Sequence, residues 1–302
     1  MDIRWLQDFL TVAETGNFTR AAEIRNISQA AFSRRIKSLE EWLGTPLIDR
    51  AAFPTRLTPA GEHFRERAVD LVQQLTEARV GLSGADTGRG TPIRIALPHA
   101  LATGRLPSWW SAWTRQGRLD ARCEAVPGNV HDTVTALVSG DADILICFHA
   151  AQQPIHLAPD QYERVVIGTE SFRPYVAKSS ASQVRKHFPG SRDQPMALLM
   201  YSPGAYLARM LDLVMDSAPE RLVGRRVFES DMADVLRNMA ISGHGIAWLP
   251  ECTAISAPDA TLAPITTEGW SLTLSVVAYR GKQRRGPAID RVWAALSAKP
   301  AG

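Results

Sequence analysis

Two short helical patterns on either side of a tight turn, within Asn17–Arg50, constrain this chain more than any other feature. Apolar residues recur at helical spacing in the first pattern, and Arg25-Asn26-Ile27-Ser28 then interrupts it with turn and cap residues. The Ser28 hydroxyl can accept from the free amides of the next turn, so we expect a second helix to begin there and to end at Gly44.

The second helix carries the side chains that a reader of the DNA major groove needs. Its apolar face is predicted to bury Ala31, Phe32, Ile36, Leu39 and Leu43, and its opposite face presents Gln29, Ser33, Arg34 and Lys37. Arg pairs bidentately with guanine, Gln with adenine, and Ser with either a base or a phosphate. The pattern alone leaves open an ordinary helical hairpin with a solvated polar face.

Positive charge is concentrated in the same stretch of the chain. The net charge of +3 does not by itself indicate a nucleic-acid binder. Residues 20–37, however, hold five basic side chains against Glu23 alone, a local net charge of +4. Arg50 and Arg56 extend this charge into Thr45–Leu57, which we interpret as a short wing that contacts phosphate or the minor groove.

In this region the chain resembles the LysR-type transcriptional regulators, and the resemblance continues to the last residues. The matching residues are Trp5-Leu6, Phe9-Leu10, Val12-Ala13, Asn17-Phe18-Thr19-Arg20-Ala21-Ala22, Ser28-Gln29-Ala30-Ala31-Phe32-Ser33-Arg34-Arg35-Ile36, Leu39-Glu40, Leu43-Gly44, Leu47-Ile48, Arg50 and Leu57-Thr58-Pro59-Ala60-Gly61. Ala30 departs from the usual Pro or Ser, and Asp49 from a frequent Phe, but neither change removes a DNA-contacting group.

The resemblance implies a winged helix-turn-helix DNA-binding domain over residues 1–58. Its expected DNA-binding residues are Thr19, Arg20, Ser28, Gln29, Ala31, Ser33, Arg34, Lys37, Arg50 and Arg56.

A long helix is expected from Thr58-Pro59, where a hydroxyl cap precedes a proline at the first helical position. Apolar residues then recur every three or four positions and predict a coiled-coil seam of Phe64, Ala68, Leu71, Leu75, Ala78 and Leu82. A helix reaching Ser83 would be roughly 37 Å long, too long for the small preceding domain to cover. We therefore expect a partner chain to cover it, in a homodimer or homotetramer, and the alternative is an amphipathic helix packed on its own chain.

Glycines at 81, 84, 88 and 90 predict a hinge, so residues 59–90 form a dimerising linker helix and hinge. Beyond it, strand, turn and helix alternate, which favours parallel βαβ units. The expected elements are strands at Ile93–Leu97, Ala121–Val126 and Asp143–Phe148, a helix at Val130–Val138, crossing strands at Gly168–Lys178 and Pro264–Ala278, and a last helix at Pro287–Ser297.

The resemblance implies that residues 91–302 form an α/β, two-lobed, periplasmic-binding-protein-like effector domain. Lobe I would span 91–166 and 267–302, and lobe II would span 167–266. The clearest local marker is Gly243-His244-Gly245-Ile246-Ala247-Trp248-Leu249-Pro250, similar to the family's glycine-rich turn into a buried strand.

An effector is expected where strands end and helices begin, because free amides at helix N-termini attract anions. The candidates are His99, Ala100, Leu101 and Thr103, then Pro127 and Gly128, then Phe148 and His149, and in lobe II Tyr201, Ser202, Tyr206, Ser230 and Asp231. We expect Tyr201–Tyr206 to open the first helix of lobe II. The family usually has Ser or Thr after the first strand, so His99-Ala100 weakens the prediction of a carboxylate effector, although Thr103 or Ser202 could substitute. His99 and His149 can equally be histidines hydrogen-bonded at a lobe edge, whereas a protonated histidine would favour an acidic effector.

The turns at His99-Ala100-Leu101 and Tyr201-Ser202-Pro203, and the segment Gly245-Ile246-Ala247-Trp248-Leu249-Pro250-Glu251, also resemble the hypochlorite-responsive branch of the family, in which methionine oxidation is the signal. Six methionines fall in the predicted lobe II: Met196, Met200, Met210, Met215, Met232 and Met239. Met232, beside a predicted helix start, is the preferred redox candidate, and core packing is the alternative for most of the others.

Other chemistry finds little support in the sequence. Cys123, Cys147 and Cys252 lie far apart, without metal spacing or a disulfide framework, and the first two fall in predicted buried strands, so we expect small buried hydrophobes and no thiol switch. No phosphate loop, nucleotide fingerprint or metal-binding histidine pair occurs, which predicts neither enzyme activity nor a cofactor.

The rival class is a two-lobed solute-binding protein without a regulatory role. The chain has no run of eighteen apolar residues and its N-terminus lacks the apolar core of a secretory signal, so we expect a cytoplasmic protein without membrane association. The expected partners are double-stranded DNA with a two-fold symmetric operator, a small effector or oxidant, and RNA polymerase. Signal and DNA would be coupled by a population shift.

Overall fold

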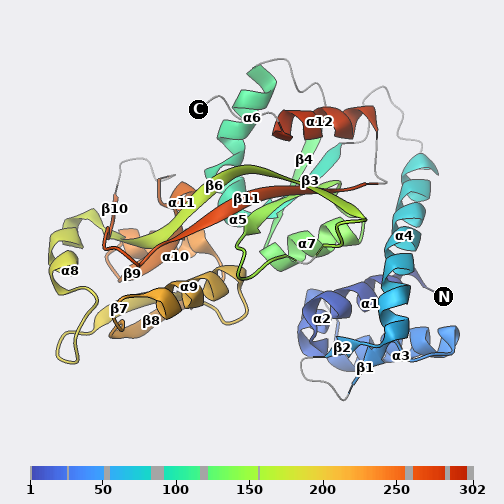
Figure 1. Cartoon of the computed structure of the whole chain (residues 1–302), viewed down its shortest axis with the longest axis horizontal. Coiled ribbons are helices and arrows are strands. Elements are labelled where there is room, and N and C mark those ends of the chain that lie inside the picture. Colours follow the sequence, from blue (N-terminus) through green and yellow to red (C-terminus); the bar gives the residue numbers. More distant parts are fainter. Residues whose placement is uncertain are drawn as a thin grey trace.

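The N-terminal part of the chain folds as three helices and a two-stranded wing (Figure 1). The computed structural model describes residues 2–25, 27–50, 55–82, 92–115, 122–155, 157–255, 261–282 and 286–297. The elements of this part are α1 (Ile3–Thr15), α2 (Phe18–Ile24), α3 (Gln29–Leu43), β1 (Ile48–Asp49) and β2 (Arg56–Leu57). β1 and β2 pair antiparallel, which confirms the predicted wing in the residues described.

Side-chain and glycine caps determine where the helices of this domain begin and end. The Asn17 amide oxygen accepts from the Arg20 N–H at 3.0 Å, and the Ser28 hydroxyl accepts from the Ala31 N–H at 3.2 Å. Gly44 ends α3 in the left-handed conformation, with φ of 72°. The predicted helix-turn-helix is therefore confirmed, together with the expected caps of α3.

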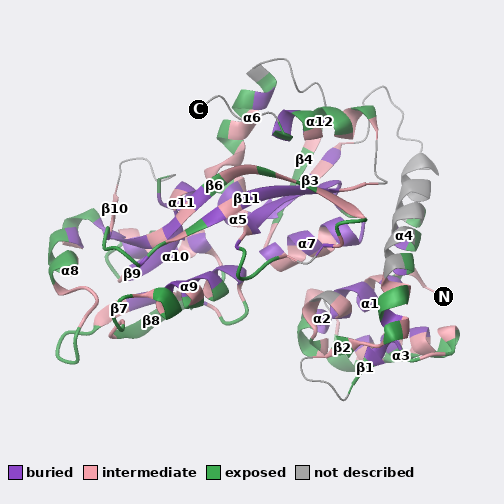
Figure 2. Ribbon diagram, in the orientation of Figure 1, coloured by how far each residue is buried: buried purple, intermediate pink, exposed green. Residues whose placement is uncertain are grey.

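A compact apolar core holds the three helices together (Figure 2). Phe9 of α1 and Phe32, Ile36 and Leu39 of α3 are fully buried. Phe18 packs edge-on against Phe32, with ring centroids 5.9 Å apart. Because α3 is buried along one face only, its polar face is left at the surface.

The long helix α4 (Pro59–Leu82) begins against the DNA-binding domain. The Thr58 hydroxyl accepts from the Gly61 N–H at 3.0 Å and donates to the Pro46 carbonyl at 2.8 Å. A Cβ at Gly61 would overlap the backbone carbonyl of Leu47, so only glycine allows the helix to start this close.

The predicted dimer seam along α4 is corrected in its first part. Phe64 packs on Phe9 with ring centroids 5.4 Å apart, and Ala68 is fully buried within its own chain, as is Val72, which the heptad pattern passed over. α1 lies along α4 and covers these side chains. Leu71 and Leu75, in contrast, are 37% and 48% exposed. The side chains of Ala78 and Leu82, and the predicted hinge at 83–90, fall outside the described part of the chain.

One sheet runs through the whole effector domain. Among the described residues it holds nine strands in the order β4-β3-β5-β11-β6-β9-β7-β8, with β10 paired to β6. Their bounds are β3 (Ile93–Pro98), β4 (Cys123–Gly128), β5 (Ile144–His149), β6 (Tyr162–Ala177), β7 (Met196–Tyr201), β8 (Gly224–Ser230), β9 (Ile246–Pro250), β10 (Leu262–Pro264) and β11 (Leu272–Gly281). The first three strands are parallel, as are β7, β8 and β9, and these two groups define lobe I and lobe II.

Helices cover both faces of this sheet (Figure 1). In lobe I they are α5 (His99–Gly104), α6 (Leu106–Arg115), α7 (Val130–Val138) and the returning α12 (Pro287–Ser297). In lobe II they are a 3-10 turn (Lys178–Ser180), α8 (Ala181–His187), α9 (Tyr206–Ser217), α10 (Ala233–Ile241) and α11 (Glu251–Ile255). Among the described helices, none is both long and apolar enough to cross a bilayer.

The two lobes are joined by the long strands β6 and β11, which pair antiparallel from Leu272 opposite Phe172 to Gly281 opposite Tyr162. β11 also pairs with β5 of lobe I, and β6 pairs with β9 of lobe II. Two crossing strands were predicted, but their bounds are corrected. The first begins at Tyr162 rather than Gly168, and the second is divided into β10 and β11 by residues 265–271.

Three smaller expectations are also corrected. The predicted turn after the first strand is helix α5, since His99-Ala100-Leu101-Ala102 favours a helix. Tyr206 opens the second helix of lobe II, because α8 precedes it. Cys123 is only half-buried, because β4 is an edge strand that pairs with β3 alone among the described strands.

Replacing Gly61 with Ala is expected to destabilise the DNA-binding domain by about 1–3 kcal/mol, because the new methyl group must displace the Leu47 backbone. Thermal unfolding of the full chain would show an earlier first transition. Gly168→Ala is the matched control, since a Cβ there meets nothing within 4 Å. Equal unfolding temperatures for the two variants would contradict the close approach.

Candidate functional site

The exposed face of α3 brings together most of the side chains predicted to read DNA. Gln29, Arg34 and Lys37 are exposed, whereas Ser33 and Ala31 are half-buried. Ser28 is exposed as well, but its hydroxyl serves as the helix cap. Thr19 and Arg20 on α2, and Arg50 and Arg56 on the wing strands and the turn between them, are all exposed.

The basic side chains on and around this face differ in whether they form ion pairs with carboxylates. Lys37 lies 3.6 Å from Glu41, Arg20 lies 3.3 Å from Glu23, and Arg50 lies 2.9 Å from Glu40. The cation of each pair is about half exposed or more, so these pairs are weak and can exchange for phosphate. Arg34 has no ion-pair partner among the described residues, which leaves its guanidinium available to a base.

Two arginines counted in the sequence as part of the positive face are bound elsewhere. Arg25 and Arg35 both donate to the carboxylate of Asp8, which is completely buried in α1. Asp8 was not predicted as a site residue. In the sequence it can be recognised as an acidic residue on the buried face of a helix, close to Leu6 and Phe9.

In the effector domain, polar side chains of lobe I and lobe II contact one another. The Thr103 hydroxyl, near the end of α5, lies 3.0 Å from the His99 carbonyl and 3.3 Å from both oxygens of the Asp234 carboxylate. Asn129 donates to Asp231 at 3.2 Å. The predicted residues Thr103 and Asp231 therefore lie where lobe I meets lobe II, and Asp234 was missed because only the fold brings it there.

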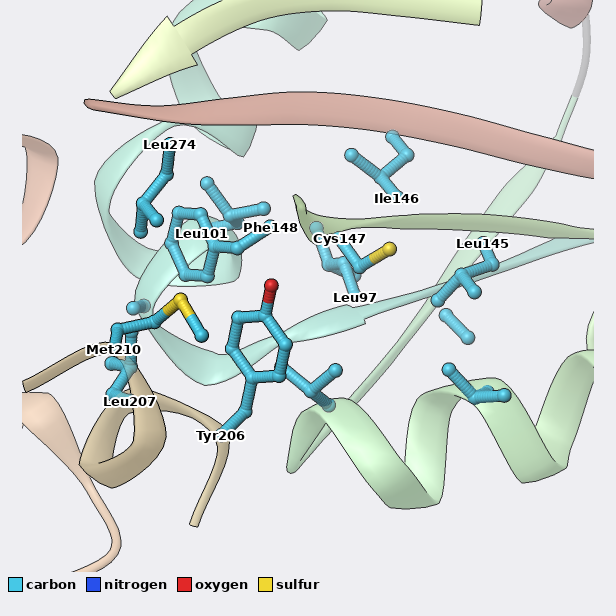
Figure 3. Packing of buried hydrophobic residues seen from close by; sticks show 14 of the residues in the cluster. Leu97, Leu101, Leu145, Ile146, Cys147, Phe148, Tyr206, Leu207, Met210 and Leu274 are labelled. Atoms are coloured by element: carbon cyan, nitrogen blue, oxygen red, sulfur yellow. The ribbon is translucent and has the colours of Figure 1, made fainter. Parts of the chain in front are cut away.

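Five predicted effector residues are core residues instead, which corrects the expectation that they line an accessible site. Leu101 and Phe148 of lobe I pack with Tyr206 and Met210 of lobe II in one hydrophobic cluster (Figure 3). Ala100 and Tyr201 are also buried. These residues were predicted to bind an effector because they follow strands in the sequence. The strand ends that face the other lobe, however, are occupied by apolar side chains.

Hydrogen bonds fix the two tyrosines within this packing. The Tyr206 oxygen accepts from the Ala150 N–H at 3.1 Å, which joins lobe II to the end of β5. Tyr201 donates to the Trp248 carbonyl at 2.9 Å. Burial raises the pKa of both phenols above the ordinary value, so both remain neutral. Tyr206 therefore links the two lobes, Tyr201 links two strands of lobe II, and neither phenol supplies a charge to an effector.

The predicted effector residues that keep some exposure are His99, Thr103, Pro127, Gly128, His149, Ser202, Ser230 and Asp231. Burial, and then the nearby Arg164 charge, lowers the pKa of His149. Its Nδ1 is buried and accepts no hydrogen bond from the described residues. A neutral His149 does not favour an acidic effector.

A buried carboxylate lies where the crossing strands meet the helices of both lobes. Glu170 of β6 is 1% exposed, accepts from Arg105 Nε at 2.9 Å, and accepts from the Cys252 N–H at 2.6 Å. Arg105 follows α5 of lobe I, and Cys252 lies in α11 of lobe II. Glu170 therefore connects both lobes to the crossing pair, a role that no local pattern indicated.

The sulfur-containing residues fall into two groups. Burial raises the pKa of Cys252 to about 12 and that of Cys123 to about 11, and it raises that of Cys147 further. Met210 is fully buried, whereas Met232 is half-buried at the N-cap of α10, between Asp231 and Asp234. No group of three or more His, Cys, Asp or Glu in the described part of the chain could hold a metal ion.

A helix-turn-helix domain with an exposed basic reading face, followed by a two-lobed α/β domain, defines an effector-responsive transcriptional regulator. The chain belongs to the LysR family. It matches the family model of the bacterial regulatory helix-turn-helix protein, lysR family, over residues 3–62, and that of the LysR substrate binding domain over residues 86–301.

Full-length relatives agree with this assignment. The HTH-type transcriptional regulator YjiE of Escherichia coli K12 is 30% identical over 308 residues, covering 98% of this chain and 94% of the relative. The structure of full-length HypT from Salmonella typhimurium, a hypochlorite-specific LysR-type regulator, is 28% identical with a TM-score of 0.55, covering 100% and 98% of the two chains. Vibrio fischeri DarR, solved in complex with DNA, is 28% identical with a TM-score of 0.55 and 99% coverage of both chains.

The thiols of the native protein are expected to react with Ellman's reagent at pH 8 far more slowly than free cysteine, because a pKa of about 11 or above leaves almost no thiolate. In guanidinium chloride all three cysteines should react at once. A native thiol that reacts as fast as free cysteine would contradict the expected protection and would support a thiol switch.

Proposed function

We propose that this regulator reads its operator through the exposed face of α3 and responds to an oxidant in its effector domain. The observation that carries the first part is the exposed Arg34, which has no ion-pair partner in the described part of the chain and lies on a helix whose other face is buried. Arg34 and Gln29 would read base edges, and Ser33 would contact a base or phosphate. Lys37, Arg20, Thr19, Arg50 and Arg56 would contact phosphate and fix the register.

We also propose that two copies of the chain assemble with two-fold symmetry. Leu71 and Leu75 lie one helical turn apart on α4 and are exposed on the single chain, as a coiled-coil partner requires. A second copy would cover them and would place two recognition helices on a symmetric operator. RNA polymerase is the expected final partner, and we propose regulation without catalysis, in the cytoplasm.

Arg34→Ala is expected to weaken operator binding by about 1–3 kcal/mol and to relax base preference at one position. The probe is a duplex that the protein itself selects from a random-sequence pool, with a scrambled duplex of the same length beside it. Lys37→Ala is the control, because a phosphate contact weakens both duplexes alike. Unchanged operator affinity for Arg34→Ala would exclude base reading by this residue.

The sensing part of the proposal rests on where Met232 lies. It occupies the N-cap position of α10, next to Asp231, which accepts from Asn129, and two residues before Asp234, which lies 3.3 Å from the Thr103 hydroxyl. A sulfoxide there would add a polar group beside both contacts between the lobes. A small carboxylate is less well supported, because Asp231 places negative charge beside this contact, whereas Arg237 lies 3.0 Å from Asp234 and balances its charge.

Hypochlorite is therefore expected to change operator binding of the wild-type protein, and Met232→Leu should abolish most of this change because leucine has no sulfur to oxidise. Met215→Leu, a half-buried position in α9, is the matched control and should retain the response. Binding is measured with and without hypochlorite and with a set of small carboxylates. If a carboxylate changes binding while oxidant does nothing even at a damaging dose, the oxidant proposal fails.

A further inference from the structure

The DNA-binding domain contains a buried ion cluster that joins all of its helices. Asp8 of α1 is 0% exposed, whereas the side chains of its two partners, Arg25 and Arg35, are 22% and 27% exposed. Asp8 Oδ1 accepts from Arg25 Nε at 2.8 Å, and Oδ2 accepts from Arg35 Nη1 at 3.2 Å. Gln7 Oε1 accepts from Arg25 Nη2 at 2.8 Å. Each carboxylate oxygen therefore holds a different guanidinium.

The three members come from the three parts that must be aligned for DNA reading. Asp8 lies in α1, Arg25 caps the C-terminus of α2 within the turn, and Arg35 lies in the middle of α3. Arg34 and Arg35 are neighbours in sequence, but successive helical residues point about 100° apart. Arg34 thus lies exposed at the surface, while Arg35 is turned back toward α1 and donates to Asp8.

This arrangement also changes the charge that DNA meets. An arginine on the surface of a basic helix binds phosphate of any sequence, and each such contact adds to non-specific affinity and to its salt dependence. A buried carboxylate that binds two guanidiniums removes both from this pool and neutralises one of them. Gln29 and Arg34, which distinguish bases, then act beside fewer phosphate-binding cations than the sequence of this helix contains.

We infer that Asp8 is a positioning residue that sets DNA specificity: it withdraws Arg25 and Arg35 from phosphate binding and holds the turn and α3 against α1. The inference rests on the proposed reading face of α3. It assigns Arg35, the second of two adjacent arginines on the recognition helix, to the protein interior rather than to DNA.

The test measures affinity of the full-length protein for the selected duplex and for the scrambled duplex over a series of salt concentrations. Arg35→Gln is expected to leave the salt slope unchanged, whereas Lys37→Gln should lower it by about one. Asp8→Asn should release the two arginines, so that scrambled DNA binds several-fold more tightly, the slope steepens by about one to two, and the ratio of selected to scrambled affinity falls. Glu23→Gln is the control for Asp8→Asn, because it removes the same charge from an exposed pair.

The possible outcomes distinguish an Arg35 that contacts DNA from an Arg35 that Asp8 holds away from it. A lower slope for Arg35→Gln, equal to that of Lys37→Gln, would show Arg35 on phosphate and overturn the inference. Equal weakening of both duplexes by Asp8→Asn, with an unchanged slope, would make Asp8 purely structural. If Asp8→Asn does not fold, the comparison of Arg35→Gln with Lys37→Gln still decides. An unchanged slope for Lys37→Gln would instead count against the proposed reading face.

Discussion

Strands β6 and β11 run antiparallel across the whole effector domain, and both lobes are built on this one pair. β11 pairs with β5 of lobe I, and β6 pairs with β9 of lobe II. The lobes therefore share a single sheet and cannot separate as independent bodies. Side chains that bond from one lobe to the other, or to the crossing strands, hold the two lobes in this arrangement. Glu170, Thr103 and Tyr206 are such side chains, because each bonds across from one lobe to the other or to the crossing strand.

This constraint suggests how a small chemical change becomes a regulatory one. Apolar packing around Leu101, Phe148 and Met210 resists partial displacement, since packed cores rearrange in steps rather than continuously (Figure 3). The polar contacts of Asp231 and Asp234 at its edge are weaker and more accessible. A signal that alters these contacts needs only a few kcal/mol of differential stability to shift the population of two lobe arrangements.

Local patterns in the sequence predicted the local parts of this structure well. The predicted cap Ser28, the helix end at Gly44 and the bounds of α12 were correct, because caps and helical periodicity act over a few residues. The predictions that were wrong concern residues whose partners lie far away in the sequence. Asp8 was overlooked and Arg35 was counted with the DNA face, since their ion pair spans 27 positions. Phe64 was assigned to a partner chain although Phe9 covers it, and Leu101 and Phe148 were assigned to an effector although Met210 of lobe II packs with them.

In this regulator two linked recognition helices would read one operator, and the effector domain would control how they do so. DNase I footprinting of the promoter next to the gene, with and without oxidant, tests this directly. We expect two protected half-sites whose centres are separated by whole helical turns, each of about 10 base pairs, and a footprint that changes in length when oxidant is added. A single protected half-site, or a footprint that oxidant leaves unchanged while the protein stays folded, would contradict it.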